Sequence, residues 1–253
     1  MNGKVYLVGS GPGGIGFLAQ RAREVIDRAD VVLYDQLPGE EILATLPPDA
    51  ELIDCGKYGG MHTLEQEEIE KLMIDRAKQG NAVVRLKGGD PFLFGRGGEE
   101  VEAVRAAGIE VEMVPGISSA LAVPASVGIP LTHRKYASQV TIITGHEDPT
   151  KPAPALDWKL LAKSRSTIVI LMGVANLPKI IDSLVTHGKN IKTPVAIIER
   201  GLRKNRRVTV GTLSSIMRKV KKARVKPPAV IVIGDVVKLY DPDAPDLIPT
   251  EWE

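Results

Sequence analysis

The sequence has little cysteine and no long apolar run. Cys55 is the only cysteine among the 253 residues, which excludes an intramolecular disulfide and any metal site built from several cysteines. No apolar run approaches the ~20 residues that span a bilayer, and the first residues predict a strand rather than a signal peptide. These absences predict a cytoplasmic protein that is not anchored in a membrane.

The chain also lacks an excess of charge of one sign. Lysine and arginine number 33 against 31 aspartates and glutamates, a net charge of +2 that does not indicate a nucleic-acid binder. One local exception, RKVKKARVK from Arg218 to Lys226, is typical of a patch for nucleic acid or membrane. Because Ile216 and Val220 would share one face of a helix, we interpret these lysines as its solvated face. We therefore expect neither nucleic acid nor membrane as a partner.

What the sequence does contain is an alternation of β-branched apolar runs and helix-like segments. Such an alternation predicts mostly parallel sheets covered by helices. The expected strands are Val5–Val8, Val31–Tyr34, Glu51–Asp54, Ala82–Leu86, Glu110–Val114, Val140–Thr144, Thr167–Met172, Val195–Glu199, Arg207–Thr212 and Ala229–Ile233. We expect two α/β domains with mostly parallel sheets, residues 1–116 and 117–253, and an active-site cleft between them.

The first expected strand runs into a glycine loop, VGSGPGG. Its glycines Gly9, Gly11 and Gly14 have the G-x-G-x-x-G spacing of a dinucleotide site. Asp35 ends the next expected strand, where an acid could hold a ribose hydroxyl. A lone glycine pattern is weak evidence, because any backbone that approaches a ligand closely favours glycine. An NAD-dependent dehydrogenase is thus only one hypothesis.

A second loop is denser, RLKGGDPFLFGRGGEE from Arg85 to Glu100. Its paired glycines indicate that backbone groups contact a ligand directly. Three more loops follow expected strands, namely PGISSALA, MGVANL and ERGL. Ligands of open α/β sheets bind at the carboxyl ends of strands, so we expect these loops to converge on one cleft. A dehydrogenase would need only the first glycine loop.

Together these motifs resemble the uroporphyrinogen-III C-methyltransferases of the tetrapyrrole methylase family. The likeness runs from Val5 to about Val237, and its most specific parts are KGGDPFLFGRGGEE and GIPLTHR. It implies a homodimer that acts on a small-molecule tetrapyrrole without a metal. The implied reaction transfers two methyl groups from S-adenosyl-L-methionine to C2 and C7 of uroporphyrinogen III. The implied products are S-adenosyl-L-homocysteine and precorrin-2, a precursor of sirohaem, cobalamin and factor F430.

The resemblance also implies a division of roles between the two domains. The N-terminal domain would carry the substrate and catalytic side, and the C-terminal domain would bind the cofactor together with residues 88–93. Asp35 matches the proton acceptor and Lys57 the proton donor, although Asp35 could instead cap a turn and Lys57 could pair with a substrate carboxylate. The residues expected to line the cofactor pocket are Pro12, Gly88, Gly89, Asp90, Leu93, Ser118, Ser119, Met172, Gly201 and Ala229.

The substrate should require a basic pocket, because uroporphyrinogen III carries eight carboxylates and arginine holds a carboxylate with two hydrogen bonds. The substrate-binding candidates are Arg96, His62, Arg134 and Lys135. His62 has an alternative role at a helix entry, because Thr63 follows it in the capping pattern T-x-x-Q.

Three positions depart from the family pattern. Gly14 stands in place of an acid, Tyr58 in place of an arginine, and Leu202 in place of a small or hydroxyl residue. Gly14 and Tyr58 could change how substrate carboxylates are held. A methylase for a later precorrin and a non-catalytic S-adenosylmethionine sensor therefore stay open as alternatives.

Overall fold

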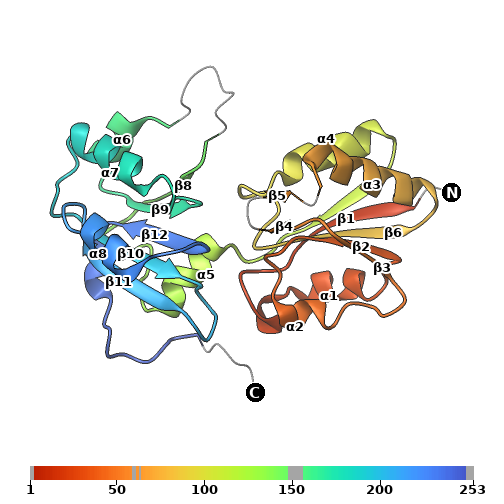
Figure 1. Ribbon diagram of the computed structural model, residues 1–253, viewed down its shortest axis with the longest axis horizontal. Coiled ribbons are helices and arrows are strands. Elements are labelled where there is room, and N and C mark those ends of the chain that lie inside the picture. Colours follow the sequence, from red (N-terminus) through yellow and green to blue (C-terminus); the bar gives the residue numbers. More distant parts are fainter. Residues whose placement is uncertain (1–2, 59–60, 63, 148–155, 249–253) are drawn as a thin grey trace. The chain divides into compact units, whose positions relative to one another are not determined.

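The protein forms two compact units, seen in a computed structural model that describes residues 3–58, 61–62, 64–147 and 156–248 (Figure 1). Unit 1 ends at Ser119 and unit 2 begins at Ala120. Each unit contains a five-stranded sheet with helices, so the expected pair of α/β units is confirmed. The expected division of roles between them stays a prediction.

Unit 1 has a parallel sheet of strand order β3-β2-β6-β1-β7. Its strands are β1 (Lys4–Gly9), β2 (Val31–Tyr34), β3 (Glu51–Asp54), β6 (Ala82–Lys87) and β7 (Glu110–Val114). Its helices are α1 (Gln20–Ile26), α2 (Glu40–Leu43), α3 (Gln66–Lys78) and α4 (Gly97–Ala106). A short hairpin, β4 (Lys57–Tyr58) and β5 (Met61–His62), lies outside this sheet and was not predicted from the sequence.

The two faces of this sheet are covered by different helices because side chains alternate along each strand. Val5, Leu7 and Val83 pack with residues of α3 and α4, whereas Val8 and Val84 pack with residues of α1 and α2. Figure 1 shows these helix pairs on opposite sides of the sheet. Residues of one parity therefore share one face along the whole length of each strand.

One local expectation in unit 1 differs from the structure. Helix α3 starts at Gln66, with Glu65 as its N-cap in a capping box with Glu68. The T-x-x-Q pattern from Thr63, a residue outside the described part, therefore does not cap this helix. After the first glycine loop the chain forms only a short 3-10 turn (Ile15–Phe17) before α1 begins.

Unit 2 has the strand order β11-β10-β12-β9-β8. Its strands are β8 (Val140–Thr144), β9 (Thr167–Leu171), β10 (Pro194–Glu199), β11 (Arg207–Thr212) and β12 (Ala229–Ile233). Only β8 and β9 pair in parallel, and the other three pairings are antiparallel. The expectation of a mostly parallel sheet is therefore wrong for this unit. The connection from β10 to β11 is too short for the crossover that a parallel pair requires, so these strands form a hairpin.

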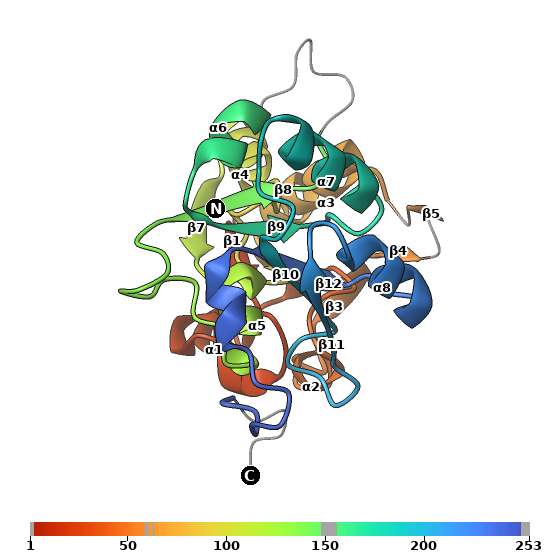
Figure 2. The ribbon, with the colours of Figure 1, turned by 90° about the vertical axis from the view of Figure 1, so that its left-hand side faces the viewer.

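One face of the unit 2 sheet is covered by three helices (Figures 1 and 2), namely α6 (Trp158–Lys163), α7 (Leu177–Thr186) and α8 (Ile216–Ala223). Helix α5 (Ser119–Ser126) and a 3-10 helix (Asp235–Leu239) complete the unit. Ile216 of α8 is fully buried in the core, while Lys221 and Lys222 are exposed. The amphipathic interpretation of the basic run is thus confirmed. Within the described residues, every helix is too short or too polar to cross a bilayer.

We expect Ile231→Ala to destabilise the protein by about 2–5 kcal/mol, because it opens a cavity in a packed core. Ile231 is fully buried in β12, opposite Ile197 of β10 and Ile170 of β9. The matched control is Leu160→Ala, since Leu160 is 65% exposed on α6. Urea unfolding measures both changes. Equal losses for the two variants would contradict the described core.

Candidate active site

The parallel sheet of unit 1 brings the expected site residues of this unit to one edge. All five strands end at the same edge, so the loops that follow them lie there together. Pro12 follows β1, Asp35 follows β2, the Gly88–Asp90 turn follows β6 and Ser118 follows β7. Lys57 also follows β3, at the start of the β4–β5 hairpin.

Glycines hold three of these loops in direct backbone contact. Gly11 and Gly89 exchange two hydrogen bonds, with N···O distances of 3.2 Å and 2.7 Å. A Cβ on Gly116 would lie 2.1 Å from the Gly89 carbonyl oxygen, and a Cβ on Gly9 would lie 2.5 Å from the Gly116 nitrogen. The carboxylate of Asp90 accepts a hydrogen bond from the Gly116 N–H at 3.2 Å. Glycine is required here because no side chain fits between the loops.

This packing explains the G-x-G-x-x-G spacing without a dinucleotide. Gly9 approaches the loops after β6 and β7, a Cβ on Gly11 would lie 2.8 Å from the Phe17 oxygen of its own loop, and a Cβ on Gly14 would lie 2.6 Å from the Glu41 carboxylate. The 3-10 turn that follows Gly14 is three residues long, whereas a pyrophosphate site uses the N-terminus of a full helix. The geometry therefore argues against the dehydrogenase hypothesis.

Exposed apolar side chains occupy the same loops. Phe92 is 55% exposed, and Leu37, Phe94 and Ile117 are also exposed, while Leu93 is half-buried. Exposed apolar groups gathered on loops at a strand edge are typical of a ligand-binding surface. Of these residues, only Leu93 was predicted from the sequence to belong to the site. Phe92 and Phe94 flank Leu93 in the PFLF segment, so their position next to Leu93 could have indicated them from the sequence.

Four charged side chains, Asp35, Arg85, Lys87 and Glu100, form a buried charge cluster on the α3–α4 face of unit 1. Arg85 Nη2 lies 2.5 Å from Asp35 Oδ1, and Arg85 Nε lies 3.2 Å from Glu100 Oε1. Lys87 Nζ donates to the same Glu100 oxygen at 2.9 Å. Arg85, Lys87 and Glu100 are at most 4% exposed, whereas Asp35 lies at the rim, with 26% of its side chain exposed. The buried Arg85 therefore holds the partly exposed Asp35 carboxylate through one of its oxygens.

The cluster balances two positive charges against two negative ones. Burial and the charge of Arg85 lower the pKa of Lys87. Burial also opposes the charge of Arg85, but the carboxylates of Asp35 and Glu100 outweigh this effect and raise its pKa. Burial raises the pKa of the nearby Cys55 thiol to about 11. Among the described residues, no group of three or more His, Cys, Asp or Glu side chains could hold a metal ion.

Arg85, Lys87 and Glu100 are not among the residues predicted from the sequence to form the site. A signal was present, because the strand AVVRLK carries two cations at alternate positions. Side chains two residues apart share one face of a strand. Two cations on a helix-covered face require a buried counter-charge, which α4 supplies through Glu100.

The three basic residues of unit 1 that were expected in the site, Lys57, His62 and Arg96, lie outside the buried charge cluster. Lys57 and His62 stand opposite each other in the β4–β5 hairpin, but their side chains lie outside the described part of the chain. Arg96 is exposed, has a φ of 59°, and places Nη2 2.5 Å from Glu99 Oε2. Roles for these residues in substrate binding or proton transfer stay predictions.

In unit 2 the expected cofactor residues also share one edge of the sheet. Met172 follows β9, Gly201 follows β10, and Ala229 begins β12, which runs antiparallel to both strands. Met172 is 52% exposed and adopts a φ of 56°. Arg200 and Leu202, on either side of Gly201, also have positive φ. Such strained backbone positions cluster at ligand sites, which is compatible with the expected cofactor role of these residues, and that role stays a prediction.

Arg134 and Lys135 lie elsewhere in unit 2. They precede β8, and Arg165 precedes β9, so the three cations lie at the opposite edge from Met172 and Gly201. There they line a shallow hollow of about 270 Å³. Within this unit, the structure does not bring the two expected substrate residues together with the cofactor set.

We expect Arg85→Met to destabilise the protein by about 3–5 kcal/mol, because removing one partner leaves buried charge uncompensated. The matched control is Arg96→Met, whose exposed ion pair with Glu99 contributes at most about 1 kcal/mol. Equilibrium urea unfolding measures both losses. A loss for Arg85→Met as small as that of the control would contradict the buried charge cluster.

Known proteins are similar to this chain over nearly its whole length. Residues 4–217 match the sequence pattern of the Tetrapyrrole (Corrin/Porphyrin) Methylases. The chain is 58% identical over 239 residues, 94% of each protein, to an S-adenosyl-L-methionine-dependent uroporphyrinogen III methyltransferase of Methanosarcina barkeri. It is 49% identical over 242 residues, 95% of this chain and 99% of the relative, to a uroporphyrinogen-III C-methyltransferase of Methanocaldococcus jannaschii.

Solved structures agree with these relatives. The uroporphyrin-III C-methyl transferase from Thermus thermophilus, complexed with S-adenyl homocysteine, has a TM-score of 0.80 and 37% identity over 94% of this chain and 100% of that one. A cobalt precorrin-4 methyltransferase has a TM-score of 0.81 and 27% identity over 94% and 96% of the two chains. This chain belongs to the tetrapyrrole methylase family.

Proposed function

We propose that this chain transfers two methyl groups from S-adenosylmethionine to C2 and C7 of uroporphyrinogen III, giving precorrin-2. The observation that carries the proposal is the 58% identity over 94% of the chain to a relative named for this substrate and cofactor. The loops with the proposed site residues that follow β1, β2, β6 and β7 in unit 1, and β9 and β10 in unit 2, lie at one edge of each sheet, which supports the proposal. Identity to the cobalt precorrin-4 enzyme is only 27%, so a later precorrin is the weaker candidate.

The residues present fit S-adenosylmethionine. Gly89 has a φ of 68°, and a Cβ placed on it would meet only the Ser119 nitrogen, at 3.9 Å, so its open side can receive a ligand. In unit 2, the exposed Met172 offers a polarisable apolar surface for an adenine ring. Pro12, Gly88, Asp90, Leu93, Ser118, Gly201 and Ala229 complete the proposed set.

The cofactor supplies the activated methyl group, so the protein's share is proximity, orientation and exclusion of water. The exposed apolar residues Leu37, Phe92 and Phe94 provide a surface for the flat parts of the ligands. Asp90 is held by the backbone N–H groups of Phe92 and Gly116. Its proposed role is therefore to fix the loops rather than to move a proton.

Proton transfer is the second task of the site. Once a pyrrole carbon has gained the methyl group, a neighbouring carbon must lose a proton. We assign its acceptance to the Asp35 carboxylate, because Asp35 is partly exposed and its other side is anchored by Arg85. Lys57 remains the proposed proton donor. Arg96 and His62 are proposed contacts for substrate carboxylates, and the location of Arg134 and Lys135 makes them weaker candidates.

Two broader features also belong to the proposal. The family resemblance supports a homodimer, which light scattering of the purified protein would test. The single cysteine supports a cytoplasmic location, because reducing compartments keep thiols free.

We expect the purified protein, incubated anaerobically with uroporphyrinogen III and methyl-labelled S-adenosylmethionine, to place two labels on each tetrapyrrole. Asp35→Asn should slow methyl transfer by about 10²-fold or more, as loss of a general base does. S-adenosylhomocysteine binding, measured by calorimetry, should be kept.

The matched control is Asp49→Asn, since Asp49 is an exposed loop residue before β3. Absence of label from the wild-type reaction despite S-adenosylhomocysteine binding would refute the proposed reaction. A wild-type rate for Asp35→Asn would refute only the role of Asp35.

A further inference from the structure

The small net charge of the chain conceals two units of opposite sign. Residues 1–119 contain 12 lysines and arginines against 20 aspartates and glutamates, a net charge of −8. Residues 120–250 contain 21 against nine, a net charge of +12. Charge of one sign on part of a protein indicates a charged ligand or partner.

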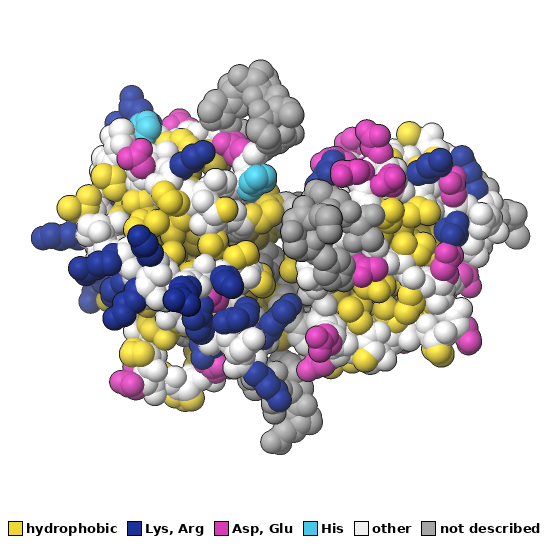
Figure 3. Space-filling view, viewed as in Figure 1, with side chains coloured by type: hydrophobic (Ala, Val, Ile, Leu, Met, Phe, Trp, Pro, Cys, Tyr) yellow, Lys and Arg dark blue, Asp and Glu magenta, His cyan; other side chains and the backbone are white. Residues whose placement is uncertain are grey.

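The positive charge of unit 2 is concentrated in one segment. From Arg200 to Gly234 there are 11 lysines and arginines and no aspartate or glutamate. This segment contains the β10–β11 turn, β11, α8 and the start of β12. Figure 3 shows lysine and arginine side chains gathered on the surface of this unit. Surfaces that serve only solubility mix both signs, so this segment needs another explanation.

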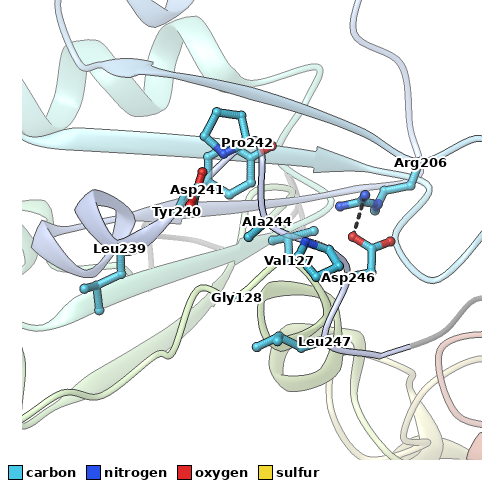
Figure 4. Close-up of a pocket in the computed structure, with 11 residues that line it drawn as sticks. Val127, Gly128, Arg206, Leu239, Tyr240, Asp241, Pro242, Ala244, Asp246 and Leu247 are labelled. Carbon is cyan, nitrogen blue, oxygen red and sulfur yellow. Dashed lines mark ion pairs between the residues drawn. The ribbon is translucent and has the colours of Figure 1, made fainter.

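Some of these cations are used by the fold. Arg207 donates to the Ala223 carbonyl at the end of α8 and to the buried carboxylate of Glu199. Arg206 pairs with Asp246 at 2.6 Å beside a hollow of about 120 Å³ (Figure 4). The guanidinium groups of these arginines are already bonded within the unit, so we do not count them among the unpaired cations.

Lys219 is also exposed, but its Nζ donates to the Val210 carbonyl at 2.7 Å. Six further cations remain exposed, and their side chains form no ion pair with any described residue. They define a basic face, made of Arg203, Arg218, Lys221, Lys222, Arg224 and Lys226. Their side chains therefore repel one another without a paired carboxylate among the described residues. A cluster of unpaired cations favours the approach of a polyanion.

The basic face adjoins the edge of unit 2 that carries the expected cofactor residues. The Lys226 backbone N–H donates to Glu199 at the end of β10, at 3.0 Å. The Arg200 N–H donates to the Pro228 carbonyl, at 2.8 Å. Arg203 and Lys226 are therefore close in the chain to Gly201 and Ala229 at this edge, and α8 leads into it.

We propose that the basic face captures the carboxylates of the tetrapyrrole before the substrate enters the reaction site. The inference rests on the proposed function, whose substrate carries eight carboxylates. A cluster of six exposed cations raises the local concentration of such an anion and the rate at which it is encountered. Because the interaction is between solvated charges, added salt should screen it.

Other polyanions fit this surface less well. Single-stranded nucleic acids use aromatic side chains for base stacking, and no Phe, Tyr or Trp occurs between Arg200 and Gly234. A helix that lies on a membrane presents apolar residues outward, whereas Ile216 of α8 is buried in the core. An acidic protein surface, including that of a second copy of this chain, is left as a distinct outcome of the test.

The test compares two charge reversals in unit 2. The test variant is Lys221→Glu with Lys222→Glu on the basic face. The control is Lys159→Glu with Lys163→Glu on α6, two exposed lysines outside the face that give the same change in net charge. We expect the test variant to lower kcat/KM for uroporphyrinogen III by about tenfold at low ionic strength, as loss of electrostatic steering does. The difference should vanish near about 0.5 M salt, where the screening length is only a few ångströms.

A second measurement does not require turnover. Fluorescence titration with oxidised uroporphyrin III, an octacarboxylate, is compared with a tetracarboxylate porphyrin. The test variant should lose affinity for the octacarboxylate more strongly, while the control and S-adenosylhomocysteine binding stay unchanged. This titration needs no methyl transfer. It therefore still measures porphyrin binding to the basic face if the protein does not catalyse the proposed reaction.

Two outcomes would overturn the inference. One is an unchanged kcat/KM together with unchanged porphyrin affinity in the test variant. The other is the loss of a salt-sensitive assembly in sedimentation with kcat/KM unchanged, which would assign the basic face to a protein surface instead.

Discussion

The structure of unit 1 depends on one steric constraint, the contact between the backbones of three glycine loops. The loops after β1, β6 and β7 approach so closely that a Cβ on Gly9 or Gly116 would lie within 2.6 Å of backbone atoms of another loop. The hydrogen bonds between Gly11 and Gly89 and from Gly116 to Asp90 then hold the loops in register. Backbone contacts and the Asp90 carboxylate therefore hold these loops together.

A second constraint acts beneath these loops. The buried charge cluster connects the end of β2 with the central strand β6 and with α4, through bonds from Arg85 and Lys87 to acidic groups. Removing one side chain of the cluster would leave a buried charge without a partner. The resulting loss of folding stability is much larger than the stability that the intact ion pair contributes. Asp35 is the only one of the four that is partly exposed, so its bond to Arg85 also holds a carboxylate at the end of β2, where the loops lie.

The sequence predicted the strands well, because β-branched runs such as Val31–Tyr34 and Ala229–Ile233 are nearly unambiguous signals. It did not predict strand direction in unit 2, which depends on how connections such as Arg200 to Arg206 turn. It also missed the roles of Arg85, Lys87 and Glu100, because arginine, lysine and glutamate are normally exposed. Among the expected site residues of unit 2, Met172 and Gly201 lie at the same edge of the sheet. Arg134 lies at the opposite edge, and the GIPLTHR motif alone did not predict that position.

The net charge of the chain did not predict the basic face, for a different reason. The interaction between exposed charges falls off over about 8 Å at physiological salt, a length shorter than a single one of these units. An approaching polyanion therefore responds to the charges near its point of contact rather than to the sum over the chain. A protein with a net charge of +2 can thus present a face on which six cations stand without an acid in the surrounding segment. For a substrate with many carboxylates, the distribution of charge along the chain carries the functional information, and the total does not.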